Sequence, residues 1–558
     1  MNKRVFGVAV LGSAVALAAA VLLSGAEEGR SLRDAPSLQE MATAVGTPPM
    51  KLIVRGQAPG TSDAIALVPR PHRFMGSNWD LTTIDTETPD VNTSHPNPWD
   101  YLVKVPIVVY GPDRVESGKE IDRPVDLTSI APTYAELLGA TGLEADGAPL
   151  PGITRSNAPA PKVIATVVID GGGWNVLQRH PGSWPEIRAL MDDGTVYSNA
   201  TVGSVPSVTA PIHTNIGTGA YPRRHGVGTN PVLSSGDPSR IDVPTISDVW
   251  GAETDNEAVT SMIAYEDIHL GMLGHGAQLD GGDQDVAVLW GGENRWRTID
   301  PFFTLPTYLD EPGEETLRAG EEELDERDGL EDGTWFGLSL QEIRSNVYRT
   351  GTPAFVQMTG DAVSDVLTGE GFADDETTDL LWVELKSPDY TGHAWGMSHP
   401  AMADTLLEVD AQIGRLKDEL EAVAGPGGYI LSITADHGMQ PPPNEVGGWQ
   451  INTQELMIDL TVEFGDVVEK VTPTDVRLRP SALEDLNVDP TDIARFIGAY
   501  TLADNIPDDA EGRGRVPEAR LGERLFAGAF PSQFLRSLSS DEIAALGKGD
   551  FPEGDYEN

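Results

Sequence analysis

The chain has 558 residues, with 87 Asp plus Glu against 38 Lys plus Arg, a formal net charge of −49. This length exceeds a single core of up to about 250–300 residues, so we expect a large core with insertions, or two domains. The charge disfavours binding to nucleic-acid duplexes and to anionic lipid, which carry the same sign. The sequence contains no cysteine, which excludes disulfides, thiolate metal sites and a cysteine nucleophile.

The first residues predict export. MNKR is followed by an apolar run that ends in the small residues Ser24, Gly25 and Ala26, as in secretory signals. The run is also long enough to span a bilayer, so residues 1–27 are a cleaved signal peptide or a retained N-terminal anchor. The protein is therefore expected to be secreted, or attached to the membrane at the cell surface if the anchor stays.

The next part of the chain contains short apolar runs between irregular stretches. The polar residues 28–50 are expected to be a linker, and apolar runs follow at 51–54 and 64–68. The sequence SHPNPWDYLVKVPIVVYG, residues 94–111, ends in a strand pattern, and LTSIAPTYAELLGA, residues 127–140, predicts a helix that ends at a glycine. Residues 145–162 are rich in Pro, Gly and Ala and predict a second linker.

Three β-branched apolar runs then predict strands that are buried on both faces: VIATVVID (163–170), LLWVEL (380–385) and YILSITAD (429–436). Helical patterns such as residues 403–423 lie between them. This alternation predicts an α/β fold with a mostly parallel sheet sandwiched by helices. Each run ends in, or soon reaches, an acidic residue, at the edge of the sheet where ligands gather.

These patterns divide the chain into expected units. Residues 163–440 are expected to be the catalytic core, and an acidic, Gly-rich stretch over about 240–375 is expected to be an inserted cap. Residues 441–558 are expected to form a C-terminal extension.

Several clusters carry side chains suited to catalysis or metal binding. They are Asp170, Thr209 within SVPSVTAPIHTNIGTG, Asp389 and His393 within SPDYTGHAWG, and Asp436 and His437 within TADHGM. Each cluster alone has an ordinary structural explanation, since a Thr in this setting can simply cap a helix. Their order and flanking residues together are more informative than any one of them.

Taken together, these clusters resemble the alkaline phosphatase superfamily, and most closely its nucleotide pyrophosphatase/phosphodiesterase branch (type I phosphodiesterases). TAPIHTNIGTGAYPRRHGVGTN, residues 209–230, is similar to the branch's nucleophile segment, and LLEVDAQIGRL, residues 406–416, resembles the helix between its two metal motifs. The resemblance covers about residues 160–235 and 380–440.

This resemblance implies a site with two zinc ions and a phosphothreonine intermediate formed at Thr209. The first ion would be bound by Asp170, Asp436, His437 and the Thr209 oxygen, and the second by Asp389, His393 and one more histidine. Imidazole and carboxylate ligands suit zinc, and other divalent transition metals such as manganese or iron also fit them. Asn230, which ends the matched segment, would donate a hydrogen bond to a phosphate oxygen.

The last histidine ligand is missing from its usual place, because no histidine follows His437. HPNPWDYLVKVPIVVYGPDRV and VDLTSIAPTYAELLGA instead resemble the family's C-terminal end, although they lie near the front of this chain. We therefore expect a circular permutation in which residues 51–144 supply the closing part of the catalytic domain. His95 would then complete the second metal site.

The function that this resemblance implies is an exported hydrolase of phosphoric esters, acting on phosphodiesters or nucleotide pyrophosphates. Two alternatives stay open: a phosphomonoesterase with the same site, and an acidic surface protein that keeps only a relict fold. A sulfatase is disfavoured, because position 209 is neither cysteine nor serine.

The other candidate side chains have simpler structural explanations. His213 and His225 are expected to be structural, and a pair of arginines in the cap is expected to be solvated rather than to bind phosphate. Polar surface or turn positions are expected for His269, His275 and His399. The two arginines are Arg295 and Arg297.

Overall fold

The computed structural model describes residues 32–60, 64–76, 93, 95–153, 160–291, 294–309, 313–345, 347–507, 510 and 513–551. The segment 1–27, expected to be a signal peptide or an anchor, lies outside the described residues. Among the helices that are described, none combines the length and the apolar character needed to cross a membrane.

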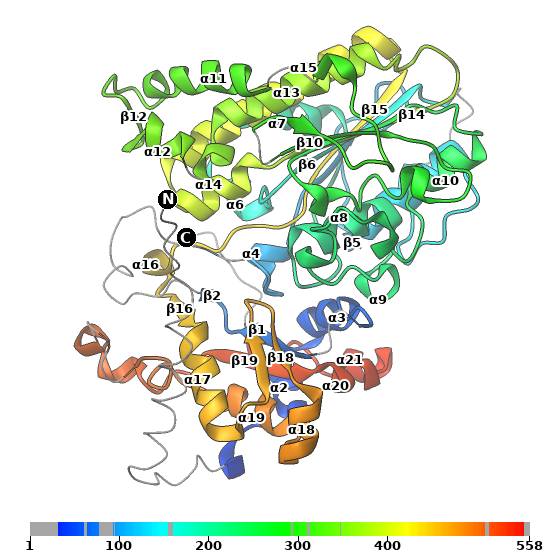
Figure 1. Cartoon of the computed structure of the whole chain (residues 1–558). Helices are drawn as coiled ribbons and strands as arrows, with labels where there is room; N and C mark the ends of the chain where they lie inside the picture. Colours follow the sequence, from blue (N-terminus) through cyan, green and yellow to red (C-terminus); the bar gives the residue numbers. More distant parts are fainter. Residues whose placement is uncertain are drawn as a thin grey trace, which may run out of the picture.

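A mixed sheet forms the centre of the molecule, with helices on both faces (Figure 1). In the described part of the chain its nine strands run in the order β11 (Trp296–Arg297), β10 (Val286–Trp290), β9 (Thr260–Ala264), β14 (Asp379–Leu385), β6 (Val163–Ile169), β15 (Tyr429–Ala435), β3 (Ile107–Tyr110), β7 (Thr195–Tyr197), β4 (Lys119–Glu120). The run from β10 to β15 is parallel throughout. The predicted α/β fold with a mostly parallel sheet is confirmed.

The sheet is buried on both faces, and its central strands are accordingly mostly apolar. In β6, Ile164 and Val168 pack in one layer with α5 (Ile130–Leu138), α8 (Thr209–Thr218) and α10 (Ile246–Glu253). Val163 and Val167 face the opposite layer. That layer contains α7 (Pro185–Asp193), α13 (Pro353–Gly369) and α15 (Pro400–Ala424). A strand between two helical layers needs no polar face, which explains its continuous apolar pattern.

The register of the parallel strands aligns three charged residues. Ile169 pairs with Leu385 of β14 on one side and with Ala435 of β15 on the other. The next residues along these strands are Asp170, Lys386 and Asp436. The three therefore emerge side by side at the carboxyl edge of the sheet, where ligands of such folds bind.

Strand β3 brings the front of the chain into this sheet. It pairs antiparallel with β15 and with β7, and it follows the short helix α4 (Asp100–Val103). The strand expected after His95 thus lies two places from β6 in the same sheet.

A smaller sheet of four strands lies below the main one in Figure 1. Its order is β17 (Val468–Val471), β18 (Asp475–Leu478), β1 (Ala64–Pro69), β19 (Phe526–Pro531). The helices around it are α2 (Leu38–Val45), α3 (Thr47–Arg55), α17 (Thr453–Phe464), α18 (Pro480–Leu486), α19 (Pro490–Ala499), α20 (Ser532–Ser537) and α21 (Ser540–Ala544). Next to this sheet, β2 (Arg73–Gly76) pairs in parallel with β16 (Trp449–Asn452). This pair joins a segment near the front of the chain to one that follows the last strand of the main sheet.

Three expected boundaries differ from the structure. The linker expected over 28–50 is wrong from residue 38 onward, because α2 and α3 bury Met41, Val45 and Met50 in a hydrophobic cluster. The closing segment expected from residue 51 includes β1, which pairs with β18 and β19 rather than with the main sheet. The C-terminal extension therefore does not fold apart from the front of the chain.

The cap expected over about 240–375 is wrong in its first part. Its two short apolar runs, TSMIA and VAVLW, form β9 and β10 of the main sheet. The helices α11 (Gly313–Arg327) and α13 follow and pack on the sheet. The acidic and Gly-rich residues between the strands conceal the short apolar runs in the sequence.

The linker expected over 145–162 has no helix or strand in its described residues, 145–153 and 160–162.

Candidate metal centre

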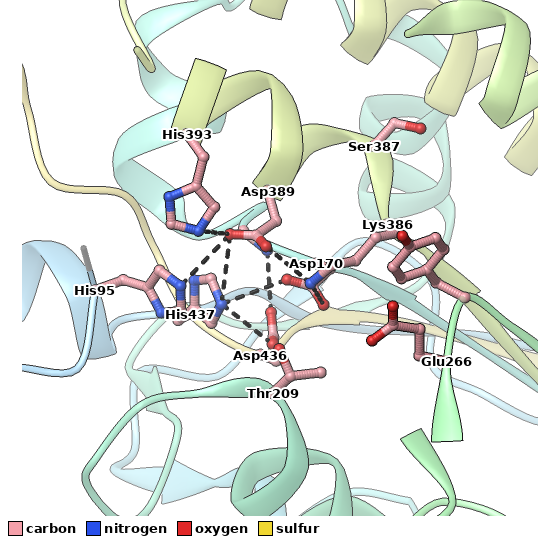
Figure 2. A network of polar contacts seen from close by, with 12 residues as sticks. His95, Asp170, Thr209, Glu266, Lys386, Ser387, Asp389, His393, Asp436 and His437 are labelled. Atoms are coloured by element: carbon pink, nitrogen blue, oxygen red, sulfur yellow. Dashed lines mark hydrogen bonds and ion pairs between the residues drawn. The ribbon is translucent and has the colours of Figure 1, made fainter. Parts of the chain in front are cut away.

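Carboxylates and imidazoles from four separate segments converge at the carboxyl edge of the main sheet (Figure 2). Asp170 follows β6, and Asp436 with His437 follows β15. Asp389 and His393 lie on α14 (Ser387–Trp395), four residues apart and therefore on one face of the helix. The remaining segment carries His95, which reaches the cluster from the front of the chain.

The first donor group consists of Asp170, Asp436 and His437. The His437 Nε2 atom lies 3.4 Å from Asp170 Oδ1 and 3.3 Å from Asp436 Oδ2. All three side chains are fully buried. Their ligand atoms lie within 4.8 Å of one another, a spacing that one metal ion can bridge.

The second donor group is built around Asp389 Oδ1. His393 Nε2 lies 3.2 Å from this oxygen, and His95 Nε2 lies 3.5 Å from it. His437 Nε2 is 4.0 Å away, so the two donor groups adjoin. The structure thus brings together all six predicted carboxylate and histidine ligands.

The donor atoms at the centre have the character of metal ligands. Asp170 Oδ1, Asp389 Oδ1, Asp436 Oδ2 and His437 Nε2 are buried and form no hydrogen bond. A buried polar atom without a partner costs about 1–3 kcal/mol, and more if it is charged. Carboxylate oxygens and imidazole nitrogens are ligands that zinc and neighbouring divalent metals bind. The residues therefore fit the two metal ions that the sequence predicts.

Backbone carbonyls fix the orientation of the histidines. His95 Nδ1 lies 2.8 Å from Ser207 O, and His393 Nδ1 lies 2.7 Å from Thr93 O. His437 Nδ1 lies 3.0 Å from Gly438 O. A carbonyl oxygen only accepts, so each Nδ1 carries the proton and each Nε2 offers its lone pair to the centre. This is the usual support for a metal-binding imidazole.

Thr209 begins helix α8 beside the first donor group (Figure 2). Thr209 is only 2% exposed. The backbone N–H of Ala210 donates a 2.9 Å hydrogen bond to Asn230 Oδ1, which holds Asn230 against the same helix start. The N-terminal end of a helix carries partial positive charge and attracts anions such as phosphate. The predicted nucleophile and the predicted phosphate donor therefore lie together.

The charges at the centre perturb one another. Burial raises the pKa of Asp436 to about 7, and the neighbouring Asp170 carboxylate adds to this rise. Burial also opposes ionisation of Asp389, but the positive charges of His393 and Lys386 outweigh it and lower the pKa of this carboxyl. Before any metal binds, the site thus favours the ionised form of Asp389 and disfavours that of Asp436.

Sequence reasoning missed Lys386. Its side chain is 4% exposed, and its ammonium lies 2.7 Å from Asp170 Oδ2 and 2.8 Å from Asp389 Oδ2. Lysine after a strand carries no special signal in a single sequence. Only the register of β14 against β6, which places it next to Asp170, reveals its position.

His269 was expected at the surface or in a turn, and that expectation is wrong. Its side chain is fully buried, with Nε2 3.4 Å from Glu384 Oε1 and 3.6 Å from Asp170 Oδ2. His213 is also buried, its Nδ1 2.8 Å from Thr209 O, and its ring centroid lies 4.9 Å from that of His269. With Asp170 these histidines form a third donor group that adjoins the first. The segment around His269 has no motif from which this could be read.

The other histidines have structural roles. His225 is buried and bonds to Asn215, as expected. His275 is buried rather than exposed, because its Nδ1 lies 2.8 Å from Asp248 Oδ2. His399 accepts a hydrogen bond from the backbone at the start of α15.

Of the two arginines expected to be solvated, Arg295 is exposed, whereas Arg297 lies at the wall of a cleft. The cleft has a volume of about 440 Å³ and is lined by Tyr265, Trp290, Phe355 and Arg297, among others. Arg297 forms an ion pair with Asp267. Its charge is therefore already compensated by a carboxylate.

A comparison of the chain with protein-family models identifies its family. The model for type I phosphodiesterase / nucleotide pyrophosphatase matches residues 164–517, which is more than half of the chain. The chain belongs to this family. It is accordingly a member of the alkaline phosphatase superfamily, as the sequence motifs predict.

Characterised relatives of this family member are distant in sequence. Alkaline phosphatase PafA of Elizabethkingia meningoseptica is 24% identical over 340 residues, which cover 51% of this chain and 62% of the relative. Alkaline phosphatase PhoV of Synechococcus elongatus is 23% identical over 356 residues, covering 52% and 62%. A Myroides odoratus protein named calcium-transporting ATPase is 25% identical over 402 residues, covering 60% and 72%. The chain spans less than two thirds of either phosphatase.

A solved structure shares the fold of this family member. The crystal structure of wild-type alkaline phosphatase PafA superposes with a TM-score of 0.51 at 18% identity, covering 61% of this chain and 76% of that one. The likeness supports the architecture of the main sheet and its helices.

Proposed function

We propose that the protein is an exported, two-metal hydrolase of phosphoric esters that acts on phosphodiesters or nucleotide pyrophosphates. The observation that carries this proposal is the pair of adjoining donor groups beside Thr209, whose innermost oxygen and nitrogen atoms are buried and unbonded. The family to which the chain belongs supports the same class of reaction.

Each of the site residues predicted from the sequence has a role in this proposal. Asp170, Asp436 and His437 would hold one ion, and Asp389, His393 and His95 would hold the other. Two such ions supply electrostatic stabilisation of the entering and leaving oxygens in an in-line displacement. The Thr209 hydroxyl oxygen attacks phosphorus and the ester oxygen leaves, which gives a phosphothreonine that water then hydrolyses.

Asn230 and helix α8 would position the substrate. The Asn230 carbonyl oxygen is engaged by Ala210 N–H, so its amide N–H groups are the part that can bind a phosphate oxygen. The positive end of α8 lies at the same point and favours the anionic phosphoryl group. Both interactions strengthen as negative charge develops on the transferred group.

A phosphomonoesterase is the second candidate, because two of the relatives are named alkaline phosphatases. A monoester carries one more anionic oxygen than a diester and is favoured by an additional cation or donor at the site. The buried ammonium of Lys386 is bonded to two carboxylates, and Arg297 is paired with Asp267. These pairings favour diesters as the preferred substrates.

We also propose that the catalytic domain is circularly permuted. The family model begins at residue 164, so His95 and strand β3 precede the matched segment. In the fold they lie next to β15 and the second donor group. Two chain ends that lie close together at a domain surface make such a rearrangement feasible.

The decisive experiment compares hydrolysis of bis-p-nitrophenyl phosphate and p-nitrophenyl phosphate by the purified protein, before and after treatment with a chelator. We expect both activities to disappear with the chelator and to return with zinc, and we expect the diester to have the higher kcat/KM. A higher kcat/KM for the monoester would select the phosphatase instead. A protein that binds no metal and hydrolyses neither ester would be the relict surface protein.

A further inference from the structure

The buried ammonium of Lys386 connects the two donor groups. It contacts Asp170, which belongs to the first group, at 2.7 Å and Asp389, which belongs to the second, at 2.8 Å. Lys386 sits between them because it directly follows β14 and precedes α14 by one residue. Figure 2 shows its side chain reaching between the two carboxylates.

The contacts of Lys386 divide the carboxylate oxygens into two kinds. The ammonium is bonded to the Oδ2 atom of Asp170 and to the Oδ2 atom of Asp389. The Oδ1 atom of each carboxylate is buried, forms no hydrogen bond and faces the histidines of its own group. Each aspartate therefore presents one oxygen to the lysine and the other to the donor group.

This division has a consequence for metal binding. A carboxylate with both oxygens free can bind a metal through either or both of them, whereas one with an oxygen held by an ammonium offers a single ligand atom. Zinc sites are usually four-coordinate, which requires one atom from each ligand. Groups that fix the orientation of ligands in this way typically contribute about 10–100-fold to metal affinity or activity.

We propose that Lys386 is a positioning residue that holds Asp170 and Asp389 for binding through one oxygen each, and that it thereby supports both metal sites at once. This inference rests on the two-metal function proposed above. Its charge also balances the two carboxylates, which are buried a few ångströms apart and repel each other without it. A lysine suits this place because its ammonium donates in several directions from a compact centre.

The test uses the whole protein, stripped of metal and titrated with zinc by calorimetry. Lys386→Met keeps the length of the side chain and removes the charge and the donors, and Lys386→Gln is a second variant that keeps a polar end. Lys417→Met is the matched control, because it removes the 2.6 Å Lys417–Asp418 pair from the surface of α15. Far-UV circular dichroism and melting of the metal-free proteins establish that each variant is folded.

We expect the wild type and Lys417→Met to bind two zinc ions, and both Lys386 variants to bind both ions about 10–100-fold more weakly. Cobalt spectra provide a second readout. Carboxylates freed from the lysine bind through both oxygens, which raises the coordination number and weakens the visible absorption of bound cobalt.

The outcomes separate this inference from the proposed function. A wild type that binds fewer than two zinc ions contradicts the two-metal function itself. A wild type that binds two, with unchanged affinities and cobalt spectra in both Lys386 variants, overturns only the role of Lys386. Weakening of one ion alone would also overturn it, since the ammonium contacts both groups.

Discussion

The imidazole rings of His95 and His437 are stacked, with centroids 3.5 Å apart and an interplanar angle of 12°. The Ser207 hydroxyl donates a 2.5 Å hydrogen bond to His95 O, and the His95 ring bonds back to Ser207 O. The front of the chain is thus fixed against the segment that leads to Thr209. The second donor group exists only because these distant parts of the chain pack together.

We predict that His95→Ala weakens binding of the second metal ion by at least about tenfold and leaves the first in place. The reason is that His95 Nε2 faces Asp389 Oδ1, whereas the first group draws its ligands from β6 and β15. Zinc per chain after dialysis, measured by mass spectrometry, should fall from two to about one.

His399→Ala is the matched control for this measurement. That imidazole accepts a hydrogen bond from Ala401 N at the start of α15 and is not part of either donor group. A full complement of zinc in His95→Ala would exclude His95 as a ligand and remove the main support for the permutation.

Replacing Thr209 should abolish turnover without unfolding the protein. Loss of the attacking oxygen removes at least about three orders of magnitude in kcat, equivalent to about 4 kcal/mol of barrier. We expect this for Thr209→Ala, and near-normal activity for Thr218→Ser, which keeps a hydroxyl at the far end of α8. Substantial turnover by Thr209→Ala with two zinc ions bound would show that another group is the nucleophile.

Variants of the second donor group should discriminate between leaving groups. We predict that Asp389→Ala and His393→Ala lose more activity on alkyl phosphate esters than on nitrophenyl esters. An alkoxide of high pKa depends more on electrostatic stabilisation of its developing charge than a nitrophenolate does. The check is the dependence of kcat/KM on leaving-group pKa, which should steepen. An unchanged slope would assign this donor group to another step.

Much of the site could be predicted because its residues lie next to strong local patterns. Asp170 and Asp436 end β-branched apolar runs that predict buried strands, and Asp389 and His393 share a helix face by spacing alone. The sequence does not show which strands are neighbours. Lys386 and His269 were missed for this reason, since their proximity to Asp170 follows from the register of β14 and from the loop after β9.

The errors in the fold have a similar cause. The polar composition of the segment containing α2 predicts a linker, although Ser37 and Glu40 form a capping box that marks a helix start. Strands β9 and β10 are only five residues long, and acidic residues and glycines surround them. The burial of β9 depends on its pairing with β14, and that of β10 on its pairing with β9. The pairing of β9 with β14 is a contact between distant segments that local composition does not encode.

The stability of the protein should depend on His225 at mildly acidic pH. Burial lowers the pKa of this imidazole to about 3. Its Nε2–H donates to Asn215 Oδ1 at 3.0 Å, and its Nδ1 accepts a 3.1 Å hydrogen bond from Val227 N–H. Protonation of Nδ1 would break the second bond, so the folded state requires the neutral ring.

The sign of the effect follows from proton linkage. Between the ordinary histidine pKa of 6.5 and the folded value of about 3, the unfolded chain binds a proton that the folded chain does not. The free energy of unfolding therefore falls as the pH drops through this range, by about 1.4 kcal/mol per pH unit for His225 alone. Above pH 6.5 this contribution no longer changes.

We predict that His225→Gln, which has no titrating ring, loses less stability than the wild type when the pH falls from 6.5 to 5. The difference between the two proteins over this interval should be about 2 kcal/mol, although the variant is less stable at neutral pH. Urea denaturation at several pH values measures it, and the carboxylates that titrate in both proteins cancel in the comparison. Parallel curves for the two proteins below pH 6.5 would mean that His225 is protonated in the folded state, contrary to its hydrogen bonds.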